Sequence, residues 1–146
     1  MEQVVIGVDP HKLSATIEVV DRHEGLLGAG RFSTDQAGYA AMRGYVRAWP
    51  QRVWAVEGAN GAGRPLAQRL LEAGGQALDV PAKLAARMRL IDTGHNRKTD
   101  ARDAHSIAVV ALRTPGLRQV WPDGDLEALR LWRTTRHGWA EALWRR

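Results

Sequence analysis

The sequence predicts an α/β fold built on one mixed β-sheet. Its first part holds three apolar runs separated by short turns, which is the pattern of an antiparallel meander. Later, short apolar runs alternate with segments of helical periodicity, and this alternation predicts parallel strands joined by helical crossovers. The length of 146 residues suits one such domain with a substantial core.

Three strands are expected before the first helix. Residues 4–9 form a short apolar run that ends in an aspartate, and residues 14–20 are rich in β-branched side chains. Turn-forming residues at 21–25 then lead into a third run at 26–32. Because the connections are short, we expect these three strands to pair antiparallel.

A helix over residues 36–48 should follow. Ser33-Thr34-Asp35 offers it an N-cap, and Pro50 lies just after its end. The fourth strand is expected at residues 52–57, and the glycine-rich stretch 58–63 then makes a turn.

The remaining pattern alternates helix, strand and helix. A helix is expected at 65–73, a fifth strand at 76–80 and a basic helix at 82–91. Residues 93–97 read as a loop, and Thr99 can cap a last helix that ends near residue 113. This order of strands and helices is that of the ribonuclease H-like fold, in which the first and fourth strands are neighbours.

Four carboxylates come together in that arrangement. Asp9 and Glu57 each end a predicted strand, so the fold brings them to one edge of the sheet. Asp100 and Asp103 lie three residues apart on the last helix, which places them on one helix face at the same edge. Carboxylate oxygens are the ligands that Mg²⁺ prefers, and such a set suits a site for two divalent ions.

Each acid also has an ordinary structural interpretation. Asp9 can be a turn residue, Asp100 can favour a helix N-terminus, and Asp103 can pair with a neighbouring arginine on the surface. Glu57 is the hardest to explain in this way, because a carboxylate directly after a buried strand needs a partner. Together the four acids favour the metal site.

The charge distribution indicates an anionic partner. The net charge is +5, and residues 51–118 hold eleven basic and six acidic side chains, a net of +5. Phosphate neutralisation dominates nucleic-acid binding, although an ordinary solvated helix face explains part of the excess. The candidate nucleic-acid-binding residues are Lys12, Asn60, Lys83, Arg87, Arg97, Lys98 and Arg102.

Several classes of protein are disfavoured. No apolar run approaches the roughly 20 residues of a membrane span, so we expect no membrane partner. The N-terminus lacks the basic region and cleavage site of a signal peptide, which indicates a cytoplasmic protein. The absence of cysteine excludes disulfides and thiolate zinc sites within this sequence.

Four motifs in the chain resemble the N-terminal, RuvC-like domain of the DEDD transposases, which are insertion-sequence recombinases guided by a bridge RNA. The motifs are Ile6–Lys12, Val56–Gly61, Val80–Lys83 and Lys98–Ala104. The resemblance implies that Asp9, Glu57, Asp100 and Asp103 are the catalytic, metal-binding tetrad, with two Mg²⁺ or Mn²⁺ ions. It also implies DNA strand transfer at element ends and a target, a guide RNA and a homo-oligomer.

Members of this family continue into a second domain that supplies a serine nucleophile. The resemblance therefore implies a RuvC-like domain over residues 1–115, and an amphipathic helix over 116–146 that begins a connector. Two alternatives are a stand-alone RuvC-like Mg²⁺-dependent nuclease and a non-catalytic nucleic-acid-binding protein derived from a truncated transposase. An actin-like or sugar-kinase ATPase is disfavoured, because that architecture needs a second half that 146 residues do not provide.

Overall fold

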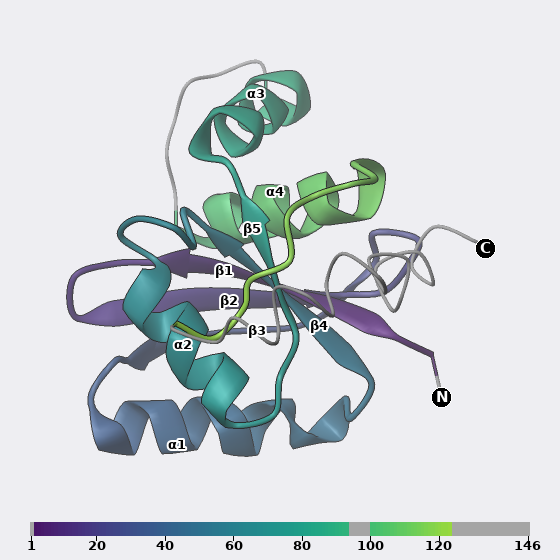
Figure 1. Cartoon of the computed structure of the whole chain (residues 1–146). Helices are drawn as coiled ribbons and strands as arrows, with labels where there is room; N and C mark the ends of the chain where they lie inside the picture. Colours follow the sequence, from purple (N-terminus) through teal and green to yellow (C-terminus); the bar gives the residue numbers. More distant parts are fainter. Residues whose placement is uncertain (1, 94–99, 124–146) are drawn as a thin grey trace.

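A mixed five-stranded sheet in the order β3-β2-β1-β4-β5 forms the middle layer of the structure (Figure 1). The computed structural model describes residues 2–93 and 100–123. The strands are β1 (Val4–Pro10), β2 (Ser14–Val20), β3 (Leu26–Ser33), β4 (Arg52–Glu57) and β5 (Ala77–Val80). The five strands confirm the predicted number and order.

The first three strands form the predicted antiparallel meander. β1 pairs with β2, and β2 pairs with β3, both antiparallel. The turn between β2 and β3 is held by Asp21, whose Oδ1 accepts hydrogen bonds from the backbone N–H groups of His23 and Gly25, each 2.8 Å long. Glu24 in this turn takes a left-handed conformation with φ of 68°. Tight local hydrogen bonding thus reverses the chain in few residues.

β4 and β5 add to the other side of β1 as parallel strands, which the alternating pattern predicted. The connections are helical: α1 (Gln36–Tyr45) precedes β4, and α2 (Arg64–Glu72) precedes β5. The helix predicted over 36–48 is α-helical to Tyr45 and continues as a 3₁₀ turn over Val46–Ala48.

Asp35 is the N-cap of α1. Its Oδ1 accepts a hydrogen bond of 2.7 Å from the backbone N–H of Gly38 and one of 2.8 Å from the Ser33 hydroxyl. These two bonds, the backbone bond first, hold the pKa of Asp35 below its ordinary value. The predicted cap is therefore the last of its three candidate residues.

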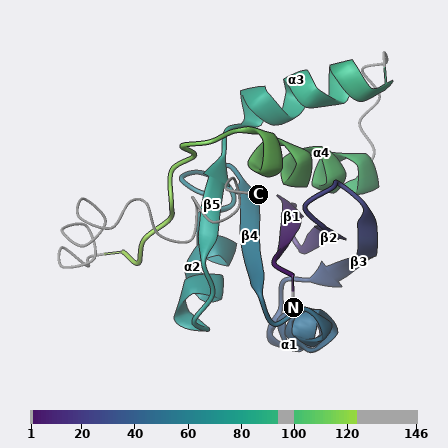
Figure 2. The ribbon, with the colours of Figure 1, turned by 90° about the vertical axis from the view of Figure 1, so that its right-hand side faces the viewer.

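Helices cover both faces of the sheet (Figure 2). α1 and α2 lie on one face, and α3 (Ala82–Thr93) and α4 (Asp100–Arg113) lie on the other. Side chains alternate along each strand, so every internal strand supplies both layers of core. One layer includes Ile6 and Trp54, and the other includes Val5, Val53 and residues of α4.

The chain after α4 runs along the free edge of β5. The backbone N–H of Asp79 donates to the Arg118 carbonyl, and the N–H of Val120 donates to the Ala77 carbonyl, both at 2.8 Å. Residues 118–120 are thus paired with the edge of β5, and the helix expected in the segment 116–146 falls mostly outside the described residues. Residues 124–146 lie outside the described part of the chain. Among the described helices, none is both long and apolar enough to cross a membrane.

Candidate metal and nucleic-acid site

The carboxyl ends of β1, β4 and β5 share one edge of the sheet, because these three strands are parallel. Asp9 is near the end of β1, and Glu57 is the last residue of β4. The pairing of Val8 with Val56 puts the two acids at equivalent positions on adjacent strands. Strand alternation directs both toward the face that α4 covers. Asp9 is buried and Glu57 is partly buried.

α4 rests directly on β1 at Gly7. A Cβ at Gly7 would lie 2.1 Å from the Ala104 carbonyl oxygen and 2.8 Å from the Ala108 backbone nitrogen. The helix backbone can approach this closely because glycine has no side chain. Asp103 precedes Ala104 and is 0% exposed, while Asp9 follows two residues after Gly7. The contact thus sets the helix turn that carries Asp103 over the strand that carries Asp9.

Asp103 has a cationic neighbour on α3. The Nε atom of Arg89 lies 3.2 Å from Oδ1 of Asp103, and the Arg89 side chain is 15% exposed. Neither carboxylate oxygen of Asp103 has a hydrogen-bond partner in the described part of the chain. The interpretation of Asp103 as a surface acid is wrong, because α4 buries it between the sheet and α3.

A histidine and a threonine line the site beside Asp9. Nε2 of His11 lies 3.4 Å from Oδ2 of Asp9 and 3.5 Å from Oγ1 of Thr16. Thr16 pairs directly with Asp9 across β1 and β2 and is buried. These contacts hold the Asp9 carboxylate at the strand end.

A buried glutamate and a histidine form a second polar contact farther along the same face of the sheet. Glu18 of β2 is 6% exposed, and its Oε1 lies 2.7 Å from Nδ1 of His105 on α4. Burial raises the pKa of Glu18, and the hydrogen bond and charge of His105 oppose this rise. His105 of α4 therefore contacts a carboxylate in the sheet.

The predicted tetrad is only partly described. Asp100 opens α4, but its side chain lies outside the described part of the structure. Among the side chains that are described, no three His, Asp or Glu residues form a group able to hold a metal ion. The donor chemistry nevertheless fits Mg²⁺ or Mn²⁺, because Asp103 presents two buried carboxylate oxygens without hydrogen bonds.

The predicted nucleic-acid-binding residues lie around the same edge where they are described. Lys12 is exposed in the β1–β2 turn, and Lys83 and Arg87 are exposed on α3, which follows β5. Because loops after parallel strands share an edge, the β1–β2 turn and the start of α3 lie at the edge of the sheet where Asp9 and Glu57 lie. Three further candidates have no described side chain: Arg97, Lys98 and Arg102.

Asn60 has a structural partner. It is exposed in the turn after β4, and its Nδ2 donates a hydrogen bond of 3.1 Å to Asp79 of β5. The same aspartate accepts a bond of 2.9 Å from the Ala59 backbone N–H. Asp79 therefore fixes the turn that follows Glu57.

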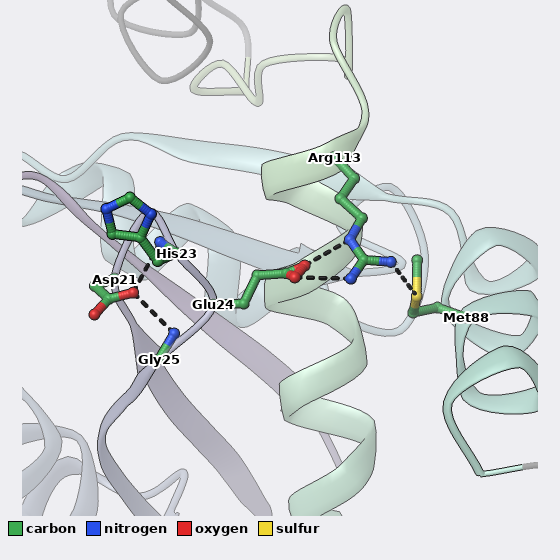
Figure 3. A network of polar contacts seen from close by, with 6 residues as sticks. All are labelled: Asp21, His23, Glu24, Gly25, Met88 and Arg113. Carbon is green, nitrogen blue, oxygen red and sulfur yellow. Dashed lines mark hydrogen bonds and ion pairs between the residues drawn. The ribbon is translucent and has the colours of Figure 1, made fainter. Parts of the chain in front are cut away.

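The far end of α4 is tied to the β2–β3 turn (Figure 3). Arg113 donates two hydrogen bonds to the Glu24 carboxylate, from Nε at 2.5 Å and from an Nη atom at 2.7 Å. The sulfur of Met88 on α3 also lies 3.7 Å from Arg113. This network joins α3, α4 and the turn that Asp21 stabilises.

Sequence reasoning missed two residues of the site, Glu18 and Arg89, and did not predict the contact between Glu18 and His105. A signal existed for Glu18, since it is the one charge inside a β-branched run of residues 14–20. Arg89 carried no such signal, because it is one of several basic residues on α3 and its burial depends on how α3 packs on α4.

Comparison with known proteins gives a family and a fold. A model of the DEDD transposases of the IS110 type, described as "Transposase", matches residues 6–146. Two solved structures of Thermus thermophilus RuvC are similar at 18% identity and cover 99% of the RuvC chain. One covers 80% of this chain with a TM-score of 0.55. The other, RuvC in complex with a Holliday junction substrate, covers 81% with a TM-score of 0.57. A search of proteins with curated functions found no match.

Proposed function

Since the chain belongs to the DEDD transposase family of the IS110 type, we propose that it acts on DNA phosphodiesters during transposition through a metal site built by Asp9, Glu57, Asp100 and Asp103. Its ribonuclease H-like, RuvC-like fold supports this assignment. The observation that carries the proposal is the approach of α4 to β1 at Gly7: Asp103 on this part of α4 is buried, and β1 carries Asp9 next to its last residue.

Divalent ions, Mg²⁺ or Mn²⁺, would be held by the four carboxylates and would supply charge stabilisation for the attacking and leaving oxygens of phosphoryl transfer. The protein's own contribution is positional. β1 and β4 carry Asp9 and Glu57 at one sheet edge, and in the proposed site α4 would supply Asp103 from a later part of the chain. Burial strengthens the pull of these carboxylates on a cation, because the local dielectric constant is low.

The exposed basic residues would hold the substrate. Lys12 lies in the turn after β1, and Lys83 and Arg87 lie on α3 after β5. Their ammonium and guanidinium groups neutralise backbone phosphates without reading sequence. Arg97, Lys98 and Arg102 belong to the same basic stretch of sequence and join them in the proposal. A guide RNA and assembly into a homo-oligomer are proposed on the family relationship alone.

The test is a transposition assay with Asp103→Asn and Asp9→Asn, and with Glu72→Gln as a matched control. Glu72 is an exposed acid at the end of α2, on the opposite face of the sheet. Each aspartate variant should lower strand transfer by at least about 100-fold, which corresponds to roughly 3 kcal/mol in the transition state. The control should act like the wild type. Wild-type transfer by Asp103→Asn would refute the proposal.

A stand-alone nuclease is the second candidate, favoured by the similarity of fold to RuvC alone. The two functions separate in one experiment, in which this chain by itself is incubated with branched DNA and Mg²⁺. Repeated cleavage that Asp103→Asn abolishes would replace the transposase proposal with a nuclease. Retention of metal binding without cleavage would support a site that works only within a larger recombinase.

A further inference from the structure

Glu18 is a carboxylate in the middle of an internal strand. It pairs with Gly7 across β1 and β2, directly beneath the point where α4 rests on the sheet. Burying an ionisable group there is unfavourable without a partner. His105 supplies that partner, with Nδ1 2.7 Å from Oε1 of Glu18.

The pair holds one flank of α4 while Asp103 occupies the other. Asp103 and His105 are two residues apart, and each helical residue turns by about 100°, so their side chains leave the helix about 200° apart. Asp103 meets Arg89 of α3, and His105 meets Glu18 of β2. α4 is thus fixed from both sides within a single turn.

The surface beneath that turn is made of small residues. Gly7 of β1 meets the backbone of Ala104 and the backbone and Cβ of Ala108. Such a contact lets the helix approach closely, but at this point it has no large side chains that interlock. The larger α4 side chains Ile107 and Val110 pack in the core cluster that includes Val5. A rotation of about 10° moves a carboxylate about 6 Å from the helix axis by about 1 Å, which exceeds the tolerance of about 0.5 Å for a functional site.

We propose that Glu18 and His105 are positioning residues that set the rotation of α4 about its axis and thereby aim the Asp103 carboxylate at the metal site. This inference rests on the function proposed above. Their hydrogen bond provides the direction that the flat contact between Gly7 and the alanines does not.

The chain offers a matched control for this pair. Arg113 and Glu24 also join α4 to the hairpin of β2 and β3, through two hydrogen bonds (Figure 3). Arg113 lies eight residues after His105, which is about 12 Å along the helix. If these contacts only attach α4 to the hairpin, removing either one should change Mn²⁺ affinity equally. If the contact of His105 positions Asp103, removing it should lower Mn²⁺ affinity and removing the contact of Arg113 should not.

The experiment is a titration of the chain with MnCl₂, followed by the EPR signal of free Mn²⁺, together with the melting temperature of each variant. The main variant is Glu18→Leu combined with His105→Leu. Replacing both partners of a polar contact with apolar residues leaves neither group buried without its partner, so the variant should fold. Its Mn²⁺ affinity should fall about tenfold, the lower end for residues that orient metal ligands.

Two further variants give the contrast. His105→Asn places an amide nitrogen near the position of Nδ1 and should keep Mn²⁺ affinity within about twofold of wild type. Arg113→Met should do the same, even if its melting temperature falls.

Wild-type Mn²⁺ affinity in the double variant would overturn the inference. Should that variant not fold, His105→Ala replaces it, and equal affinities in His105→Ala and His105→Asn would also overturn it. Failure of the proposed function would give different results. If Asp103→Asn binds Mn²⁺ as tightly as the wild type, or if the wild type does not bind Mn²⁺, both the proposed function and this inference are refuted.

Discussion

Replacing Gly7 by alanine tests the contact on which the site depends. The added Cβ would lie 2.1 Å from the Ala104 carbonyl oxygen, 2.8 Å from the Ala108 nitrogen and 2.9 Å from the Ala108 Cβ. Two of these atoms belong to the backbone of α4, so no rotamer change relieves the overlap. Since ordinary contacts begin near 3.4 Å, α4 has to move away from β1 by about 1 Å.

The displacement has a cost that follows from packing. Overpacking a core typically lowers the free energy of unfolding by about 1–3 kcal/mol. Because the new Cβ meets backbone atoms of α4, which cannot change rotamer, we expect about 3 kcal/mol for Gly7→Ala. For a chain of this size, each kcal/mol lowers the melting temperature by about 2–4 °C, so a decrease of about 6–12 °C is expected. Asp103 moves with α4, so Mn²⁺ affinity should fall as well.

The control substitution is Gly44→Ala. Gly44 lies in α1, and a Cβ there would meet no described atom within 4 Å. Alanine in a helix interior is favoured over glycine by roughly 1 kcal/mol, so this variant should melt slightly higher than the wild type. Thermal unfolding followed by circular dichroism measures both. A Gly7→Ala variant that melts with the wild type would show that α4 does not rest on β1 as described.

Two further substitutions test the electrostatics. Arg89→Met should lower stability by about 3 kcal/mol in EDTA, because it removes the cation that pairs with the buried Asp103, and added Mg²⁺ should restore more stability than it gives the wild type. Thermal unfolding with and without Mg²⁺ measures this effect, and Arg87→Met, at an exposed position on the same helix, is the control. Equal Mg²⁺-dependent shifts of the melting temperature in the two variants would contradict the prediction. Asp35→Asn should retain the helix cap but remove a pH dependence. The folded pKa of Asp35 lies below 3.8, so its contribution is present above that value and is lost as pH falls through the lowered pKa. Urea midpoints across acidic pH should therefore fall more steeply in the wild type than in Asp35→Asn, and parallel curves would count against the cap.

Much of the fold was predictable because local patterns and topology agree. The β-branched run at 14–20 became β2 with the predicted bounds, and the run at 52–57 became β4. Helix ends were less certain, since α3 extends to Thr93, which was expected in a loop. The edge pairing of residues 118–120 was missed, because a few residues that complete another strand's hydrogen bonds carry no periodicity of their own.

The candidate site was predictable only as far as strand ends and helix faces determine it. Asp9 and Glu57 follow apolar runs, so their place at the sheet edge could be inferred from alternation. The partners of the buried acids could not be inferred. Whether Arg89 or another basic residue reaches Asp103 depends on the packing of α3 against α4, and no spacing within either helix encodes it.

The partner of Asp103 matters because of the charge that the site must balance. Asp9, Glu57 and Asp103 carry a formal charge of −3, and Arg89 reduces it to −2, which one divalent cation would neutralise. The full tetrad with Asp100 carries −4, which matches two divalent ions only when Arg89 no longer compensates Asp103. In the proposed site, Arg89 and a divalent ion would compete for the Asp103 carboxylate, since repulsion between two cations at low dielectric constant opposes their binding to one carboxylate together. Binding of a second ion should thus be coupled to displacement of the Arg89 guanidinium from Asp103.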